Sequence, residues 1–475
     1  MRQQKHGRIL WEQKWKAGGS VTGSYLRNTT PDYLTGEVFA CESIKGGLVL
    51  LNGPLGCRFY HSYGFGKNTI QESGLWHLRG ELELKNAMDD HLLRSQYFAG
   101  TPAIPGSNLR YEDNIFGTWE QLERALRDCL TEREYHFFAV LQTPGTSLLG
   151  EALEQNLSRL AKEYEVPFLF LESPQFSENA FIGFDETMVK LLHLLVPEQK
   201  RKKQAKAGAP RVNLFGFYTY EKFLEGDLAE IRSLLEIMGI EIACVPGAGS
   251  TVEELQVLPE ADLNLFFAPE RCQQTMHYLE QQGLPILDFG SMPVGFDLTE
   301  QFVKTVAERL GADASPALVR IEKDRARAFY HLARRFGNHG FPKNIRYAIE
   351  GEASFVYAWM DFLSGYLGMR PACIHLLYGQ CKGKAEEKLR RMLEEWGMED
   401  VLETDITKVE NAIVFGSGNT IMDAFLHSEK LYGVEIANPS TEYLHVVPKT
   451  YLGSKGALYL LEQLLNGVRM LGAWD

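Results

Sequence analysis

The chain has 475 residues, of which 45% are hydrophobic and 23% charged, and its formal net charge is −13 at pH 7. This composition predicts a folded protein of about three domains and excludes disordered or collagen-like chains. The acidic balance argues against nucleic acid as a partner, because counterion release from phosphates needs clustered lysines and arginines. The seven cysteines are too few for a disulfide scaffold, and no run of about 18 apolar residues predicts a membrane span. We therefore expect a soluble, cytoplasmic protein that binds neither nucleic acid nor a membrane.

Short apolar runs alternate with amphipathic stretches along the chain. In the first region we predict strands at 48–51, 137–141 and 167–171, and helices at 36–45, 119–129 and 149–164. The basic stretch 197–210, with a proline at each end, predicts a linker. In the second region we predict strands at 212–217, 240–245, 263–268 and 284–289. A helix is expected there at 228–238, capped by Asp227 and ended by Gly239.

An arginine-rich helix, predicted at 316–335, leads into the last region. There we predict strands at 345–349, 373–378 and 412–415, and helices at 354–367, 384–396 and 419–427. Because short buried strands alternate with helices of about 10–15 residues, the pattern predicts parallel βαβ units with both sheet faces covered. We therefore predict an α/β fold of three Rossmann-like, doubly wound domains, 1–199, 200–315 and 316–475, with a substrate or cofactor cleft between them.

The common signatures of metal and nucleotide sites are absent from the sequence. The two cysteines nearest in sequence are Cys373 and Cys381, so there is no CxxC ligand pair. The Gly-Lys pair at 66–67 lacks the spacing of a phosphate-binding P-loop. The stretch 416–420 lies between a predicted strand and a helix, and we interpret it as a plain turn rather than an anion site.

The stretch 36–57 carries the most chemical information. Its predicted strand is followed by a tight turn that contains Gly53 and Gly56 and presents Cys57. A cysteine at the carboxyl end of a parallel strand lies where doubly wound sheets bind their ligands. The glycines let a bulky group approach the backbone, whose N–H groups can hydrogen-bond sulfur. The alternative is a buried structural thiol, and spacing alone leaves both interpretations open.

This stretch resembles the glycine, helix, strand and H/N-G-P-x-G-C segment of the nitrogenase component 1 superfamily. That superfamily includes nitrogenase α and β subunits, cofactor-assembly homologues, protochlorophyllide reductase and the reductive cyclase of nickel tetrapyrrole synthesis. Further similar stretches lie at 111–117, 141–150, 173–176, 226–231, 235–240 and 249–255. The resemblance covers nearly the whole chain. It implies a subunit that receives electrons from a separate ATP-dependent iron protein-like reductase.

The cluster ligands of the family are only partly retained. Members that hold a full cluster supply three cysteines, and this chain has Asp32, Cys57 and the pair Thr143-Pro144 at those places. One thiolate cannot retain a [4Fe–4S] cluster, which needs about four ligands. Three alternatives follow: a partner subunit supplies most ligands, a two-fold copy adds its own Cys57 and a carboxylate from each chain, or no cluster is bound. By this logic Asp32 is a candidate ligand, although it could equally be a helix cap.

The resemblance does not predict a second, catalytic metallocluster. Its cysteine ligand would fall near Ala268 or Pro269, and Cys272 lies three or four residues away, where we expect it to pack in the core. Its histidine ligand would fall near Tyr443, and His445 is two residues off. Dinitrogen reduction is therefore not expected. The remaining thiols, at Cys41, Cys129, Cys244 and Cys373, are predicted to lie in the core.

The favoured hypothesis is a subunit of a nitrogenase-like two-component reductase, paired with an identical or different component 1 subunit. An iron–sulfur cluster shared between subunits at Cys57, with Gly53, Gly56 and the candidate ligand Asp32, would relay electrons to a tetrapyrrole-like or small organic substrate. His61 is a candidate proton donor, or simply an interface residue. The alternatives are a cluster or cofactor assembly scaffold without turnover and a clusterless docking subunit.

Overall fold

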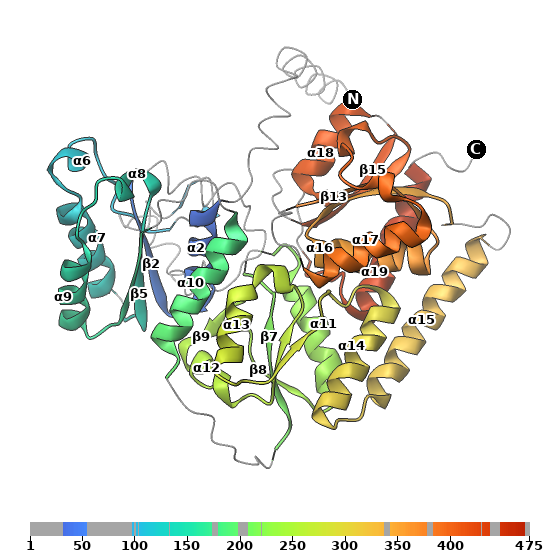
Figure 1. Ribbon diagram of the computed structural model, residues 1–475, viewed down its shortest axis with the longest axis horizontal. Helices are drawn as coiled ribbons and strands as arrows, with labels where there is room; N and C mark the ends of the chain where they lie inside the picture. The colour runs from blue at the N-terminus through green and yellow to red at the C-terminus, as the bar shows by residue number, and fades with distance from the viewer. Residues whose placement is uncertain are drawn as a thin grey trace.

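Three parallel sheets of three or four strands each, with helices on their faces, form most of the described structure (Figure 1). The computed structural model describes residues 32–54, 97–98, 101–102, 104–132, 134–172, 179–197, 208–219, 221–336, 343–377, 383–428, 430–437 and 447–470. The α/β fold predicted from the alternation of apolar runs and helices is confirmed. The domain boundaries stay a prediction, and most of the predicted linker lies outside the described residues.

The first sheet has the order β2(Gly47–Asn52), β5(Phe137–Gln142), β6(Phe168–Glu172). Helices α7(Trp119–Glu132) and α9(Glu154–Tyr164) cover one face, and α2(Tyr33–Glu42) and α10(Ala180–Leu195) the other (Figure 1). Two short helices, α6(Asp113–Phe116) and α8(Pro144–Ser147), lie at the carboxyl ends of the strands. A separate antiparallel pair is formed by β3(Tyr97–Phe98) and β4(Thr101–Pro102).

The second and third sheets share one strand order. The second sheet runs β11(Ile286–Asp288), β10(Leu263–Phe266), β7(Arg211–Phe215), β8(Glu241–Cys244). The third runs β13(Arg370–Leu376), β12(Arg346–Gly351), β14(Ala412–Ser417), β15(Leu431–Ala437). In each, the second and third strands along the chain lie on opposite sides of the first. The carboxyl end of that first strand is therefore a topological switch point, where open α/β sheets bind ligands.

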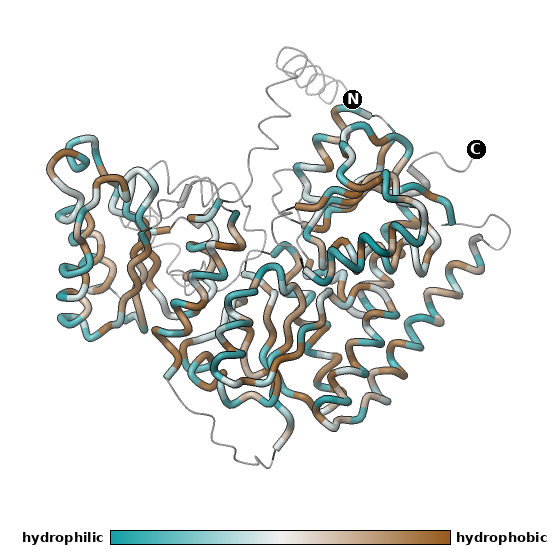
Figure 2. Tube along the Cα trace, viewed as in Figure 1, coloured by the Kyte–Doolittle hydropathy of each residue, from teal (hydrophilic) through white to brown (hydrophobic). Residues whose placement is uncertain are grey.

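Helices complete the layers around these two sheets. They are α11(Leu224–Glu236), α12(Val252–Gln256), α13(Gln273–Gln281), α14(Gly295–Leu310), α15(Ser315–Phe336), α16(Ala353–Met360), α17(Lys384–Trp396), α18(Gly418–His427) and α19(Gly453–Met470). One continuous hydrophobic core joins both sheets, because α19 packs back against α11, α14 and α15. Figure 2 shows the hydrophobic strands inside and hydrophilic segments on the outer helices. No helix among the described residues is long and apolar enough to cross a membrane.

Most predicted strands lie within two residues of the observed ones, but several helix boundaries are wrong. Helix α2 starts at Tyr33 and ends at Glu42, because Asp32 caps it. The next residues form β1(Ile44–Lys45), which pairs with the distant β9(Ser250–Thr251). Helix α9 starts five residues later than predicted, since Gly150 has a left-handed φ of +64° after α8. The helix predicted at 354–367 is α16 followed by a π-helical turn, Asp361–Tyr366.

Asp227 is not the cap of its helix. Helix α11 already begins at Leu224, and the Asp227 carboxylate instead accepts hydrogen bonds from Thr450 Oγ1 (2.6 Å) and Tyr451 N (3.1 Å). These partners precede α19, so Asp227 links the second and third regions. Burial raises its pKa to about 7, against the lowering effect of the Thr450 hydrogen bond. The local pattern suggested a cap because the distant partner cannot be read from neighbouring residues.

Helices α2 and α10 cross at very short range through two glycines. A Cβ atom on Gly36 would lie 1.9 Å from the carbonyl oxygen of Ala180, and one on Gly183 would lie 2.2 Å from that of Tyr33. Any larger side chain would therefore force the helices apart. This contact fixes α2, which precedes β1 and β2 in the chain, against α10.

We predict that Gly183→Ala lowers the free energy of unfolding by about 1–3 kcal/mol, because the added methyl group overlaps the Tyr33 carbonyl. Denaturant unfolding measures the change. Gly145→Ala is the matched control, since a Cβ atom there meets no heavy atom within 4 Å, and its effect should stay within about 0.5 kcal/mol. Equal effects of the two substitutions would contradict the close crossing.

The raised pKa of Asp227 predicts a pH-dependent contribution to stability. The folded state binds this proton more tightly than the unfolded state, so the contribution is lost as pH rises from about 4 to about 7. Asp227→Asn keeps the acceptor oxygen without the charge. It should match the wild type near pH 4 and exceed its free energy of unfolding at pH 8, by at most about 4 kcal/mol. Denaturant titrations at both pH values test this, and a variant less stable than the wild type at pH 8 would contradict it.

Candidate functional site

The turn after β2 is held rigidly at the carboxyl edge of the first sheet. Gly53 N donates to Ser107 Oγ (3.0 Å), which donates to Asn52 Oδ1 (2.8 Å). The Asn52 carbonyl accepts from Thr143 N (3.1 Å). A Cβ atom on Gly53 would lie 2.3 Å from Thr143 Cγ2, so only glycine fits. The predicted site residues Gly56, Cys57 and His61 lie outside the described residues, and this turn is the described part of their segment.

A second network of hydrogen bonds holds Asn52, the last residue of β2, in place. Asn52 Nδ2 donates to Thr118 Oγ1 (3.2 Å), and Thr118 N donates to the Glu151 carboxylate (2.7 Å). Thr146 Oγ1 donates to the Asn52 carbonyl (2.9 Å). Asn52 is fully buried although it is polar. Its side-chain amide and its backbone carbonyl therefore help to position the segment that leads to Cys57.

Asp32 lies at the same edge. Helix α2 packs along β2 and leads into it through a short connection, so the start of the helix and the end of the strand lie together. Asp32 Oδ1 accepts from Thr35 N (2.9 Å) and Thr35 Oγ1 (2.6 Å), which makes the residue an N-cap. Oδ2 has no hydrogen-bond partner within the described part of the chain. The N-cap therefore uses only one carboxylate oxygen of Asp32, and Oδ2 is available to bind another group.

The five cysteines that the structure describes are all buried: Cys41, Cys129, Cys244, Cys272 and Cys373. Burial raises the pKa of the Cys41, Cys244 and Cys272 thiols well above the ordinary value, and that of Cys373 to about 11. Such thiols are poor metal ligands, because the thiolate is the binding form. Within the described ranges, no three His, Cys, Asp or Glu side chains converge as a metal site. Among the described residues, none of these thiols is therefore suited to hold a metal.

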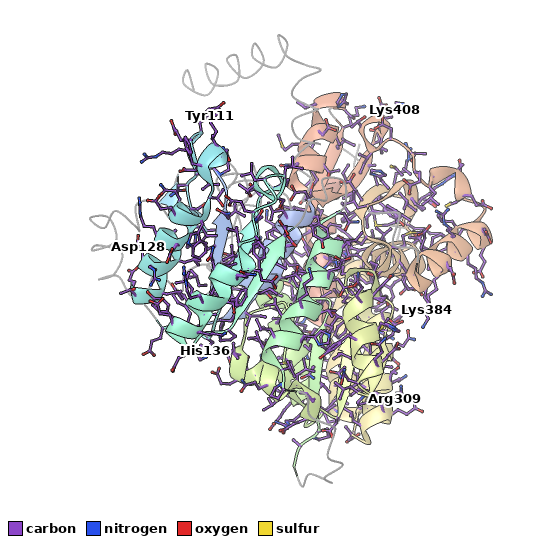
Figure 3. The ribbon with its side chains drawn as sticks, turned by 60° about the vertical axis from the view of Figure 1, so that its left-hand side comes forward. Tyr111, Asp128, His136, Arg309, Lys384 and Lys408 are labelled. Carbon is purple, nitrogen blue, oxygen red and sulfur yellow. The ribbon has the colours of Figure 1, made fainter. Side chains whose placement is uncertain are left out.

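Apolar side chains are exposed beside this edge. Tyr111, Ile115, Phe116 and Leu148, on or next to α6 and α8, are between 62% and 86% exposed. The two loops lie together because Glu151, after α8, accepts from Thr118, after α6. Figure 3 shows Tyr111 at the outer tip of this region. Large apolar side chains that gather on one surface are typical of an interaction site.

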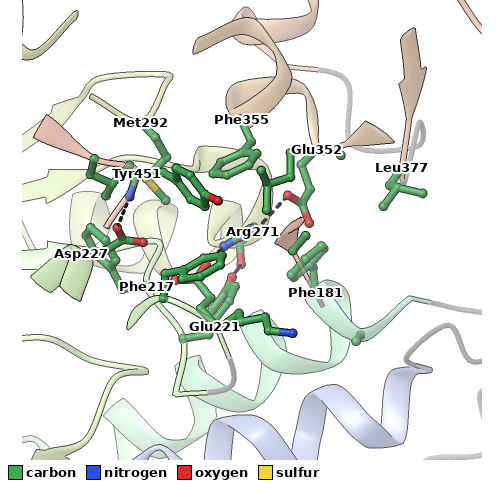
Figure 4. A pocket seen from close by; sticks show the side chains of 18 of the residues that line it. Phe181, Phe217, Glu221, Asp227, Arg271, Met292, Glu352, Phe355, Leu377 and Tyr451 are labelled. Carbon is green, nitrogen blue, oxygen red and sulfur yellow. Dashed lines mark hydrogen bonds and ion pairs between the residues drawn. The ribbon is translucent and has the colours of Figure 1, made fainter. Parts of the chain in front are cut away.

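A cavity of about 120 Å³ lies where the three regions meet (Figure 4). Its walls come from α2 and α10, from the segments after β7, β10 and β11, and from the carboxyl ends of β12, β13 and β15. Both switch points thus open into it. The aromatic residues that line it are Phe39, Phe181, Phe184, Phe217, Tyr218, Phe223, Phe355 and Tyr451.

Arg271 is the central polar residue of this cavity. It lies 8% exposed in the 3₁₀ turn Pro269–Arg271 after β10. Its guanidinium pairs with Glu221 and, at 2.9 Å, with Glu352, and it lies 4.9 Å from the ring centroid of Phe181. Burial opposes its charge, but attraction to the two carboxylates outweighs this and raises its pKa. Arg271 thereby joins the first, second and third regions.

Two further buried links join the second and third regions beside it. Lys222 Nζ lies 2.5 Å from Glu435 Oε1, with both side chains at most 1% exposed. Burial lowers the pKa of Lys222 and the Glu435 charge counteracts this. The Asp227 bond to Tyr451 N is drawn in Figure 4. Buried pairs of this kind are strongly destabilising to break, because the remaining charge has no partner.

The described residues near the expected cysteine ligand of a second metallocluster pack in the core instead. Ala268 is buried in the core, and the Cys272 thiol donates to its carbonyl (3.2 Å), so Cys272 packs as expected. None of the described residues that line the cavity is a cysteine or histidine. Tyr443 and His445 lie outside the described residues. The stretch 416–420 is a strand-to-helix turn in which Ser417 caps α18, as predicted.

Comparisons with known proteins agree with this architecture. The family model described as nitrogenase component 1 type oxidoreductase matches residues 34–469. The B subunit of light-independent protochlorophyllide reductase from Synechococcus sp. (strain RCC307) is 24% identical over 389 residues, which cover 78% of this chain and 71% of that protein. Its counterpart from Prochlorococcus marinus (strain NATL1A) is 26% identical over 339 residues, 69% of this chain and 63% of that protein. The chain thus spans about two thirds of the length of these relatives.

The fold is similar to that of a solved structure, nitrogenase Cp1 at pH 6.5. The TM-score is 0.70, with 18% identity, and the match covers 93% of each chain. The resemblance inferred from the stretch 36–57 is therefore confirmed. Because the family match extends over most of its length, the chain belongs to the nitrogenase component 1 type oxidoreductases.

Proposed function

We propose that the chain is one subunit of a nitrogenase-like two-component reductase that carries an iron–sulfur cluster at its boundary with a second component 1 subunit. The observation that carries this proposal is the rigid turn Asn52–Gly53 at the carboxyl edge of the first sheet. It precedes Cys57 in the chain, and the free oxygen of Asp32 lies at the same edge. When bound, a [4Fe–4S] cluster would supply single-electron transfer there.

Ligand counting makes the second subunit necessary. The candidate ligands of this chain are Cys57 and, among the described residues, one carboxylate oxygen of Asp32, whereas the cluster needs about four donors. The exposed apolar side chains on α6 and α8 border the same edge and fit burial against another protein. A two-fold partner, identical or different, would bring matching donors to a shared axis. The protochlorophyllide reductase relatives are named as B subunits, so they are themselves parts of a larger enzyme.

The roles of the remaining parts follow from their positions. A separate ATP-dependent iron protein-like reductase would dock and deliver electrons, because the chain has no P-loop of its own. The cavity around Arg271 would bind the substrate, and the apolar walls would exclude water from it. His61 stays a candidate proton donor. A scaffold that holds a cluster without turnover would differ from this enzyme only in lacking reductase-dependent product formation.

We predict that anaerobically purified protein, together with any partner chain that copurifies, contains about four iron atoms and as many sulfides per shared cluster. Cys57→Ala should lose most of this iron, because the thiolate is the chain's only described or predicted sulfur donor at this edge. Iron and sulfide analysis measures it. Cys129→Ala, which removes a buried core thiol, is the control and should keep its iron. Retention of iron in Cys57→Ala would contradict the proposal.

A pair of substitutions at Asp32 separates its two roles. Asp32→Asn keeps an N-cap acceptor but replaces the ligating oxygen by an amide, whereas Asp32→Ala removes both. If Asp32 is a ligand, both variants lose iron. Only Asp32→Ala should lose stability, by about 1 kcal/mol. Iron analysis and denaturant unfolding of the same samples decide this, and full iron content in Asp32→Asn would leave the residue as a cap alone.

A further inference from the structure

Helix α15 lies at the outer edge of the molecule and packs through one side (Figure 1). That side carries Ala317, Ile321 and Ala328, each at most 1% exposed, and lies against α14 and α19. An ion pair of Arg320 with Glu230 of α11 ties it further to the second region. The opposite side of the helix is exposed along the described length from 319 to 334.

The exposed side carries a row of apolar residues, namely Val319, Ala326, Phe329 and Ala333. Val319 and Phe329 are 69% and 68% exposed. The four residues follow one another at intervals of seven, three and four, which is the spacing of the apolar seam of a coiled coil. Glu322 occupies the one remaining seam position. Because two of the four are alanines, the row lets another helix approach closely but offers little apolar area to a lipid bilayer.

Basic side chains run along one edge of this apolar row. They are Lys323, Arg327 and Arg334, which recur at helical spacing together with Tyr330. Tyr330 is 56% exposed, and Arg334 donates to its hydroxyl (3.0 Å). None of the three basic side chains forms an ion pair with a residue that the structure describes, in contrast to Arg325, which pairs with α14. The edge therefore presents uncompensated positive charge on a chain whose net charge is −13, which fits an acidic partner.

A second copy of the same helix does not fit this face. Antiparallel copies of α15 about a two-fold axis would place the two basic edges side by side, and like charges repel. Parallel copies would set each basic edge against the other edge of the seam. The exposed acid there is Glu322, which already lies 3.8 Å from Arg325 of its own helix. The face is therefore not complementary to itself in either arrangement.

We propose that the exposed side of α15 is a docking surface for an acidic amphipathic α-helix of another protein. The apolar side chains of that helix pack on the row from Val319 to Ala333, and its carboxylates face Lys323, Arg327 and Arg334. Figure 1 shows α15 on the opposite side of the molecule from the first sheet. The proposal therefore goes beyond the shared cluster at that sheet and depends on neither iron nor turnover.

Fluorescence anisotropy with two synthetic helical peptides of about 20 residues tests the proposal. Both carry leucines at the seam spacing, and they differ in having glutamates or lysines beside the seam. We expect saturable binding of the acidic peptide to the full chain, at least about tenfold tighter than that of the basic peptide and weaker at high salt. Absence of saturable binding of the acidic peptide, or equal affinity of the two peptides, would overturn the proposal.

A substitution in the apolar row locates the binding. Phe329→Ala should weaken the acidic peptide about tenfold, because it removes the large side chain near the centre of the contact. Val447→Ala is the control, since it shortens another apolar side chain that is 66% exposed, and it should change the affinity less than about twofold. Equal effects of these two variants would place the peptide elsewhere and contradict the proposal.

A charge-reversed pair tests the basic edge. Arg327→Glu with Arg334→Glu should weaken the acidic peptide at least about tenfold. Arg391→Glu with Lys408→Glu makes the same change of net charge at side chains that are 79% and 81% exposed, and it should have less than about a twofold effect. Thermal unfolding checks that both double variants fold. If the two pairs weaken the peptide equally, only overall charge matters and the docking surface is refuted.

Sedimentation with lipid vesicles examines the other possible occupant. We expect no more protein to sediment with phosphatidylglycerol vesicles than with phosphatidylcholine vesicles. Sedimentation with the anionic vesicles that is lost in Phe329→Ala would make a lipid surface the occupant of α15 and would overturn the proposal.

Discussion

The buried guanidinium of Arg271 is the interaction on which the architecture around the cavity depends. It lies under the Phe181 ring of α10, pairs with Glu221 after β7, and pairs with Glu352 after β12. Each partner belongs to a different region of the chain. A buried charge destabilises the folded state unless all its partners are in position. Arg271 therefore contributes to the arrangement of all three regions, together with the Lys222–Glu435 pair and the Asp227 hydrogen bonds.

Two kinds of site thus lie at carboxyl strand edges of the same chain. At the first sheet, backbone groups and small polar side chains hold a tight turn close to the position of Cys57. Between the second and third sheets, charged side chains and aromatic rings line a cavity. The first arrangement suits a compact inorganic group that approaches the backbone, and the second suits an organic molecule. This division agrees with a reductase in which electron entry and substrate binding are separate.

The sequence predicted the fold well because local patterns determine it. Apolar runs placed the strands, and their alternation with helices required parallel sheets. Helix starts were predicted less well, since a carboxylate such as Asp227 looks like a cap whether or not a residue 223 positions away takes it. The role of Arg271 was missed for the same reason. Its acidic partners lie 50 and 81 positions away, and no local signal distinguishes a buried arginine from an exposed one. A proline-containing turn directly after the apolar run 263–268 was the only available hint.

Thr143 marks one difference between this chain and family members that supply three cysteines to a cluster. It occupies the loop where the third cysteine of the family would fall, and its side chain packs against Gly53 in the turn that leads to Cys57. The Thr143 side chain is buried there. A single substitution at this position would therefore place a sulfur atom beside the turn without moving the backbone.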